Sequence, residues 1–216
     1  NMDHKTVLCF GDSNTHGTVA MISPTEKRRF AKAERWPSVM GRLLGEEWDV
    51  IAEGHPGRTS VLDDPVDGSH KNGFRALHAI LESHRPIDLT ILMLGTNDLK
   101  VRFALSAHDI SLCIRRLVVE IQNSDTGLNG QAPRVLIAAP INVIETGIFV
   151  EMFAGAAKKS VALTNKLRDL AKSQQVDFID LNEFATVDPV DGIHLDVVGQ
   201  AAVGVAMATA VAELIF

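Results

Sequence analysis

The chain has 216 residues, of which 46% are hydrophobic and 22% are charged. This length suffices for one domain with its own core, and this composition excludes a largely disordered chain. A formal net charge of −6 and the lack of a clustered basic patch argue against nucleic-acid binding. The two cysteines, Cys9 and Cys113, form no Cys-x-x-Cys pair, so zinc or thiol redox chemistry has no support.

The ends of the sequence carry no targeting signal. The first residues lack the charged and then apolar pattern of a signal peptide. The longest apolar stretch, 201–216, includes Glu213 and is shorter than a membrane span. A cytoplasmic location without membrane association is therefore the default expectation.

Strand and helix patterns alternate along the chain. The first apolar run, 6–10, ends at Gly11 and predicts a strand; apolar residues at helical spacing then predict a helix over 36–44. The same alternation continues towards the C-terminus. Further strands are predicted at 49–52, 89–94, 135–139 and 176–181, and further helices at 74–81, 106–121, 155–173 and 196–216.

Five strands separated by helices predict an α/β fold. The expected architecture is a single domain over 1–216, a three-layer sandwich whose five-stranded, mostly parallel sheet has helices on both faces. Right-handed crossovers leave few possible strand orders, of which the flavodoxin-like one suits five strands. No repeat, linker or low-complexity tract divides the chain.

Residues suited to acyl transfer follow four of the five predicted strands. Ligands of such folds bind at the carboxyl ends of the strands, where the loops of this chain meet. Ser13 follows the first strand, on a loop where the next helix has not begun, and His194 precedes the last helix. Asp191 is three residues before His194 and can accept from its Nδ1, leaving Nε2 free to face Ser13. Each of these residues alone has an ordinary alternative, such as a turn serine or a surface histidine.

Donors for a developing oxyanion are present at the same edge. The Ser13 backbone N–H is one, Gly57 can bring its N–H close to a ligand, and Asn97 supplies an amide. Gly54 is the alternative to Gly57 in its loop, and a turn-forming role is the alternative for Asn97. Because these groups converge with Ser13 and His194 at one edge, the sequence favours a catalytic site over separate turn-forming roles.

Neither a metal nor a cofactor is expected. The segment 63–68 resembles the start of a calcium loop, but Pro65 replaces a ligand and Phe74 stands where the bidentate acid belongs. Two histidines in loops near the predicted site, His16 and His55, are plausible pocket residues. Solvent exposure is the simpler explanation for the others, His70 among them.

Four sequence blocks resemble those of the GDSL/SGNH hydrolases. They are residues 10–15 (FGDSNT), 53–57 (EGHPG), 95–98 (GTND) and 191–194 (DGIH). The resemblance implies the SGNH hydrolase fold, a triad of Ser13, Asp191 and His194, and an oxyanion hole of Ser13, Gly57 and Asn97. It is closest to bacterial arylesterases and acyltransferases, which implies a small-molecule ester as substrate, with acyl transfer to alcohols as a further activity, and a homo-oligomer.

The expected substrate contacts come from the loops and from one departure from the family motif. Asn14 replaces the usual leucine of that motif and is expected to line the pocket. Apolar residues near the strand edge predict a small acyl pocket with a hydrophobic wall, although ordinary core packing would also explain them. They are Ile144, Phe149, Phe153 and Ile193.

A flavodoxin-like binding module is the competing hypothesis. The segment 11–17 superficially resembles a phosphate cradle. No Gly-x-Gly-x-x-Gly motif, Walker lysine or ribose-binding acid follows it. The sequence therefore favours an esterase for short acyl esters, either aryl esters or acetylated carbohydrates, over a nucleotide-binding domain.

Overall fold

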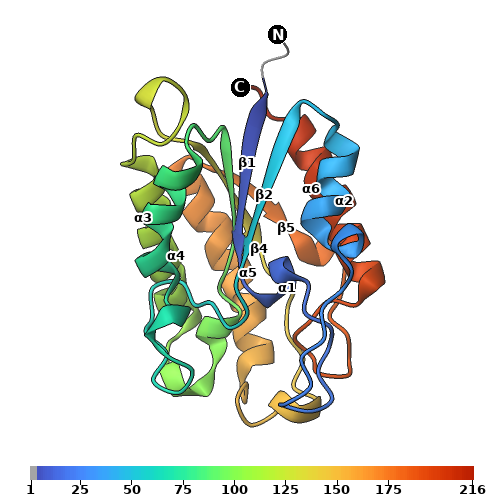
Figure 1. Cartoon of the computed structure of the whole chain (residues 1–216). Helices are drawn as coiled ribbons and strands as arrows, with labels where there is room; N and C mark the ends of the chain where they lie inside the picture. Colours follow the sequence, from blue (N-terminus) through green and yellow to red (C-terminus); the bar gives the residue numbers. More distant parts are fainter. Residues whose placement is uncertain (1–3) are drawn as a thin grey trace.

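A sheet of five parallel strands forms the centre of the computed structural model, which describes residues 4–216 (Figure 1). The strand order is β2-β1-β3-β4-β5, as expected for a flavodoxin-like sheet, and all four pairings are parallel. The strands are β1 (Lys5–Gly11), β2 (Trp48–Gly54), β3 (Leu89–Met93), β4 (Arg134–Ala139) and β5 (Asp177–Asp180).

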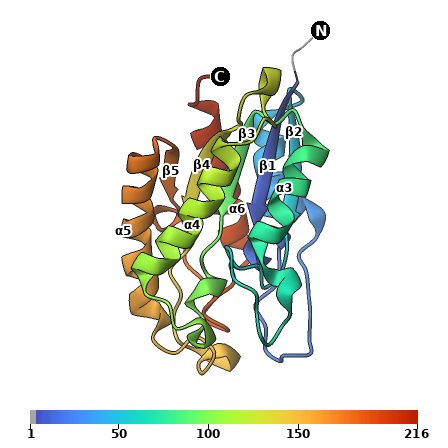
Figure 2. The same ribbon diagram turned by 90° about the vertical axis from the view of Figure 1, so that its left-hand side faces the viewer.

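Helices cover both faces of this sheet. In Figure 2, α3, α4 and α5 lie over one face, while Figure 1 shows α2 and α6 together on the other. None of the helices within residues 4–216 has the length and apolar character needed to cross a bilayer. The helices are α1 (Ser13–His16), α2 (Trp36–Leu44), α3 (Gly73–His84), α4 (Ala107–Gln122), α5 (Ala156–Gln174) and α6 (Val197–Ala212).

The alternation of side chains along β1 explains the three layers. Leu8 and Phe10 belong to the core beneath α3, α4 and α5, whereas Val7 and Cys9 belong to the core beneath α2 and α6. Every residue of β3 is buried, as expected for a strand covered on both faces.

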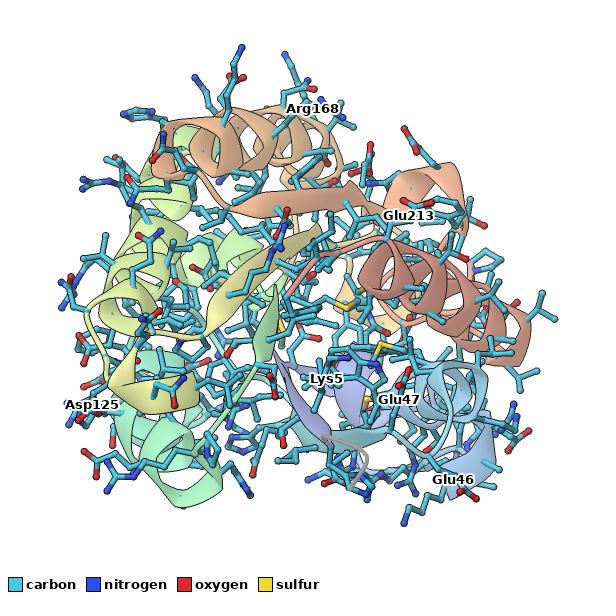
Figure 3. All side chains as sticks on the ribbon, turned by 90° about the horizontal axis from the view of Figure 1, so that it is seen from above. Lys5, Glu46, Glu47, Asp125, Arg168 and Glu213 are labelled. Carbon is cyan, nitrogen blue, oxygen red and sulfur yellow. The ribbon has the colours of Figure 1, made fainter. Side chains whose placement is uncertain are left out.

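The register brings the carboxyl ends of the strands to one edge. Gly11 at the end of β1 pairs with Gly54 of β2 and with Met93 of β3. This edge carries α1, which lies at the lower ends of β1 and β2 in Figure 1. Figure 3 looks onto the opposite edge, where β1 begins at the labelled Lys5. The loops that follow the strands therefore meet at the first edge.

Two elements differ from the sequence prediction. Helix α1 begins at Ser13, where the sequence indicates a loop, because one turn is too short to show an apolar period. Helix α6 ends at Ala212 rather than continuing to residue 216. The last residues turn back so that the Phe216 ring packs edge-on against Trp48, at 5.5 Å between centroids.

Candidate active site

Ser13 occupies the first position of α1, two residues after the end of β1. Asp12 caps the helix, its side chain accepting from the Asn14 N–H at 3.0 Å. The first N–H groups of a helix have no acceptor within it, so the Ser13 N–H is available even though the helix has begun. Ser13 lines a cavity, and 7% of the residue is exposed.

A hydrogen-bonded chain links Ser13 to His194 and Asp191. His194 Nε2 lies 3.0 Å from Ser13 Oγ, and His194 Nδ1 lies 2.5 Å from Asp191 Oδ2. His194 is 5% exposed and Asp191 is fully buried. This arrangement orients the imidazole so that Nε2 can accept a proton from the serine hydroxyl.

Asp191 is held by donors on both carboxylate oxygens. Oδ1 accepts from the backbone N–H of Ile193 and His194, at 3.0 and 3.1 Å, and Oδ2 also accepts from the Met21 N–H at 2.9 Å. Burial works to raise the pKa of Asp191, but the hydrogen bond and charge of His194, with these backbone donors, outweigh it and lower the pKa to about 2. Asp191 is therefore ionised at neutral pH and can stabilise an imidazolium.

Asp188, which like Asp191 precedes His194, has a local role. Its side chain accepts from the Val190 N–H at 2.9 Å, and its backbone bonds to His194 and Gly192. These contacts close the 188–194 loop. They agree with the turn-forming function expected for an aspartate before a proline.

Asn97 lines the same cavity as Ser13, and its side chain is anchored by a hydrogen bond. Its Nδ2 donates to the Arg58 carbonyl at 3.1 Å, which leaves its second hydrogen for another acceptor. The Arg58 guanidinium in turn donates to the carbonyls of Gly11 and Glu53, at the ends of β1 and β2, and stacks over the Phe10 ring. The strand ends thus fix the position of the Asn97 amide.

Gly54 and Gly57 serve different purposes. A Cβ at Gly54 would come within 2.2 Å of the His16 nitrogen, so glycine there lets α1 pack on the end of β2. Gly57 has a φ of +80° and lines the cavity together with Ser13 and Asn97. Of the two glycines, Gly57 is the one that lines the cavity.

A cavity of about 490 Å³ surrounds these groups, a size typical of small-molecule sites. Its lining combines apolar side chains, Phe149 and Ile193 among them, with cationic side chains. Its lining residues are Ser13, Thr18, Met21, Pro24, Lys27, Pro56, Gly57, Asp67, His70, Lys71, Asn97, Lys100, Phe149, Met152, Phe153, Ile193 and His194.

Residues 9–202 match the model of the GDSL-like lipase/acylhydrolase family. The chain belongs to this family. It is a carboxylic ester hydrolase of the GDSL/SGNH type, and its parallel sheet with flanking helices is the SGNH hydrolase fold. A comparison with curated protein sequences gives no match.

Solved structures of esterases resemble the whole chain. The native aryl esterase of M. smegmatis is 37% identical, with a TM-score of 0.93 over 98% of this chain and 100% of that one. Its inhibitor-bound form is 36% identical, with the same TM-score and coverage. Est24, a carbohydrate acetylesterase from Sinorhizobium meliloti, is 35% identical, with a TM-score of 0.93 over 98% of this chain and 100% of that one.

Of the substrate contacts expected for this GDSL-like hydrolase, Phe149, Phe153 and Ile193 line the cavity. The Phe149 ring also stands edge-on to His194, at 6.3 Å between centroids. Ile144 is placed differently: it is 43% exposed, and its N–H donates to the Gly192 carbonyl. Ile144 therefore supports the loop before His194 and does not form the predicted wall.

Asn14 also differs from its expected place. It is 3% exposed, and its side chain donates to the Ile193 carbonyl at 3.1 Å and accepts from the Leu195 N–H at 2.9 Å. The amide thus bonds to the residues on either side of His194. Asn14 ties α1 to the segment that carries the histidine, because an amide can satisfy both a donor and an acceptor there.

The histidines of the hydrolase are also arranged differently from the expectation. His70 lines the cavity, whereas His16 and His55 are not among its lining residues. Burial, together with nearby cations, lowers the pKa of His55 to about 4, so this imidazole is neutral at pH 7. Sequence position alone does not distinguish them, because the loop that carries His70 folds back over the strand edge.

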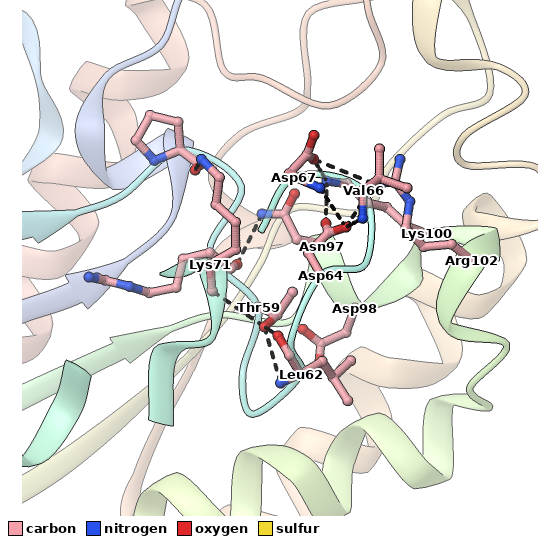
Figure 4. Close-up of polar contacts among 12 residues, drawn as sticks. Thr59, Leu62, Asp64, Val66, Asp67, Lys71, Asn97, Asp98, Lys100 and Arg102 are labelled. Carbon is pink, nitrogen blue, oxygen red and sulfur yellow. Dashed lines mark hydrogen bonds and ion pairs between the residues drawn. The ribbon is translucent and has the colours of Figure 1, made fainter. Parts of the chain in front are cut away.

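An ion network around the buried Asp64 and Lys100 supports that loop (Figure 4). Arg102 donates to Asp64 Oδ1 at 3.0 Å, and Lys100 Nζ lies 3.5 Å from Asp67 Oδ2 and 3.8 Å from Asp64 Oδ2. The segment 63–68 thus pairs its acids with cations. Within residues 4–216, no group of three or more His, Cys, Asp or Glu side chains could hold a metal ion.

Sequence reasoning missed several contributors to the site, among them Met21, Lys71 and Lys100. Met21 acts through its backbone N–H, so its side-chain type carries no signal. Lys100 follows Asn97 by three residues, and this proximity is the only indication that the sequence offers. Lys71 lies in a polar loop without periodicity.

Proposed function

We propose that this protein is a serine esterase for short acyl esters, with Ser13 as nucleophile, His194 as general base and Asp191 as the group that orients His194. The observation that carries the proposal is the hydrogen-bonded chain from Asp191 Oδ2 through His194 to Ser13 Oγ. A serine hydroxyl needs such an adjacent base to become nucleophilic.

The reaction would proceed in two steps through an acyl-enzyme. Ser13 Oγ attacks the ester carbonyl while its proton passes to His194 Nε2. The carbonyl oxygen becomes an oxyanion that accepts from the N–H of Ser13 and Gly57 and from Asn97 Nδ2. His194 then gives the proton to the leaving alcohol. In the second step water attacks the acyl-enzyme, His194 takes a proton from the water, and this proton returns to Ser13 Oγ as the acid is released.

The substrates proposed are short-chain acyl esters, above all acetyl esters of aryl alcohols or of carbohydrates. The full-length similarity to an aryl esterase and to a carbohydrate acetylesterase supports these classes. The cavity supports them too, since Phe149 and Phe153 offer an apolar wall of limited size beside Ser13. A nucleotide-binding module is the weaker hypothesis, because the site places a base against a serine.

Labelling by a fluorophosphonate tests the proposal directly. The expected result is one covalent adduct per chain, mapped to Ser13 by peptide mass spectrometry, with loss of p-nitrophenyl acetate hydrolysis in proportion. Ser111, which is also buried but bonds to a helix carbonyl, provides the internal comparison and is expected to remain unmodified. An active protein with an unlabelled Ser13 would contradict the assignment.

Acyl transfer to alcohols is proposed as a further activity. The apolar side chains at the cavity disfavour water and favour a small alcohol whose alkyl part is buried there. Each buried methylene adds about 0.8 kcal/mol to alcohol binding, so two or three can shift partitioning by tens of fold. Water is in large molar excess, so hydrolysis still dominates in dilute alcohol.

We expect measurable ester exchange from vinyl acetate to butanol or benzyl alcohol in water, rising with alcohol chain length. Product ratios measured by gas chromatography check this. The control is Ser13→Ala, which lacks the acyl-enzyme. If wild-type transfer stays at the level of this variant, the cavity holds no alcohol and the protein is a plain esterase.

A further inference from the structure

Lys71 extends directly over the proposed oxyanion donor Gly57. Its Nζ donates to the Pro56 carbonyl at 2.7 Å. Its Cδ, Cε and Nζ lie 3.3 to 3.4 Å from the position that a Cβ at Gly57 would occupy. Glycine at this position therefore serves two needs, the positive φ of the turn and room for the lysine chain.

The Pro56 carbonyl and the Gly57 N–H belong to one peptide group. A cation on the carbonyl oxygen withdraws electron density from the peptide and makes the N–H a stronger donor. The same hydrogen bond restrains rotation of this peptide plane, and thus the direction of the N–H. An oxyanion hole depends on donors that are already oriented before charge develops.

The surrounding loops hold Lys71 in this place. Its backbone carbonyl accepts from the Thr59 N–H at 2.8 Å, and its N–H donates to the Gly68 carbonyl at 3.1 Å. The first bond joins the 55–59 loop to the 68–72 loop, and the second closes a turn within the 68–72 loop. The lysine and the peptide that it contacts therefore form one unit (Figure 4 shows Lys71 and Asn97 in this region).

The ammonium of Lys71 is directed to the peptide rather than to a carboxylate. The acid that acts on it most strongly, Asp67, lies within ion-pair distance of Lys100 and Arg102. Burial and then the charge of Lys27 lower the pKa of Lys71, against the opposing effects of Asp67 and Asp64. Whenever Lys71 is protonated, its positive charge therefore acts on the Pro56 carbonyl.

We propose that Lys71 is a positioning residue for ester hydrolysis, acting through the Pro56–Gly57 peptide to orient and strengthen the Gly57 N–H of the oxyanion hole. This inference rests on the proposed function. It assigns Lys71 an effect on the transition state and none on the binding of the uncharged substrate.

The test compares Lys71→Met, Lys71→Arg, Lys27→Met and Lys172→Met, with Asn97→Ala as a reference for the loss of a whole donor. Lys172 is an exposed lysine on α5 and serves as the matched control. The kcat and KM for p-nitrophenyl acetate are measured from pH 6 to 10, corrected for base hydrolysis. Rates are normalised to the active sites that a fluorophosphonate titrates, so that misfolded protein does not contribute.

For Lys71→Met we expect kcat to fall about tenfold with KM within about twofold, because a donor is weakened but not removed. For comparison, Asn97→Ala removes a whole donor and should lower kcat by about a hundredfold or more. Lys71→Arg keeps a charged donor and should retain at least about a third of wild-type kcat. Lys172→Met should match the wild type.

The pH profile supplies a readout that a purely structural lysine would not change. Because the pKa of Lys71 lies below the usual lysine range, wild-type kcat should decline as pH rises into the alkaline region and the ammonium loses its proton. Lys71→Met should lack this decline. The other charged or titratable groups that face Lys71 are Lys27, Asp67, Asp64 and His55, and all remain in the variant.

Three results would overturn the inference. They are an unchanged kcat in Lys71→Met, an effect on KM alone, and an equal loss in Lys27→Met, which would indicate a general effect of positive charge. The Ser13→Ala variant distinguishes a wrong role for Lys71 from a wrong proposed function. If Ser13→Ala is inactive while Lys71→Met behaves as Lys172→Met does, the triad stands and only the role of Lys71 is wrong.

Discussion

Ser13→Ala should reduce kcat for p-nitrophenyl acetate by at least about 10⁴-fold while leaving the fold intact, because no other atom can attack the ester from this position. The only side-chain hydrogen bond of Ser13 Oγ within residues 4–216 goes to His194. Its loss costs about 1 kcal/mol of stability, so thermal unfolding should change little. Initial rates, circular dichroism and the melting temperature check both expectations.

The matched control for this variant is Ser111→Ala. Ser111 is also buried, but it lies on α4 and donates to the His108 carbonyl. It should lose a similar hydrogen bond and keep wild-type kcat. A Ser13→Ala protein that retains more than about a tenth of wild-type turnover would exclude Ser13 as the nucleophile.

The sheet could be predicted because burial leaves a strong pattern in the sequence. The residues of β3 are apolar and buried on both faces, and Leu8 and Phe10 alternate with Val7 and Cys9 along β1. The topology rules for parallel strands then determine which loops share an edge. This is why the sequence alone suffices to place Ser13 and His194 together, although they are 181 residues apart along the chain.

The polar details of the site could not be predicted in the same way. The Asn14 side chain satisfies both a carbonyl and an N–H beside His194, whereas its position in the motif suggests a pocket residue. Met21 reaches Asp191 through its backbone N–H, from the loop between α1 and α2. Such contacts depend on how irregular loops pack, and loops carry no hydrophobic period.

Residues 53–57 show what the sequence can and cannot predict about the site. The pattern of residues 53–57 leaves Gly54 and Gly57 as alternative donors. Packing separates them, since Gly54 makes room for the backbone of α1 while Gly57 faces the cavity. The sequence could not identify Lys71 as the neighbour of Gly57, because their contact joins two loops.

Asp191→Asn should cripple the enzyme through the tautomer of His194. Both oxygens of Asp191 accept hydrogen bonds, Oδ1 from the N–H of Ile193 and His194, and Oδ2 from His194 Nδ1 and the Met21 N–H. An asparagine amide has only one acceptor oxygen, and that oxygen will take the place facing two backbone donors. The NH₂ group then faces His194 Nδ1.

A backbone N–H cannot change, but an imidazole can move its proton. His194 will therefore carry its proton on Nε2, where it donates to Ser13 and cannot accept the serine proton. We expect kcat to fall by about 10⁴-fold, as in triads whose acid is replaced by an amide. The unpaired Met21 N–H should also lower the free energy of unfolding by about 1–3 kcal/mol.

Asp188→Asn provides the comparison, since the same change is made three residues earlier. Asp188 accepts one backbone hydrogen bond from Val190, which an asparagine oxygen also accepts. Its kcat should stay within about twofold of the wild type, because it touches neither ring nitrogen of His194. Steady-state kinetics of both variants show which aspartate orients His194. A severe loss in Asp188→Asn together with a mild one in Asp191→Asn would transfer the orienting role to Asp188, against the geometry of the loop.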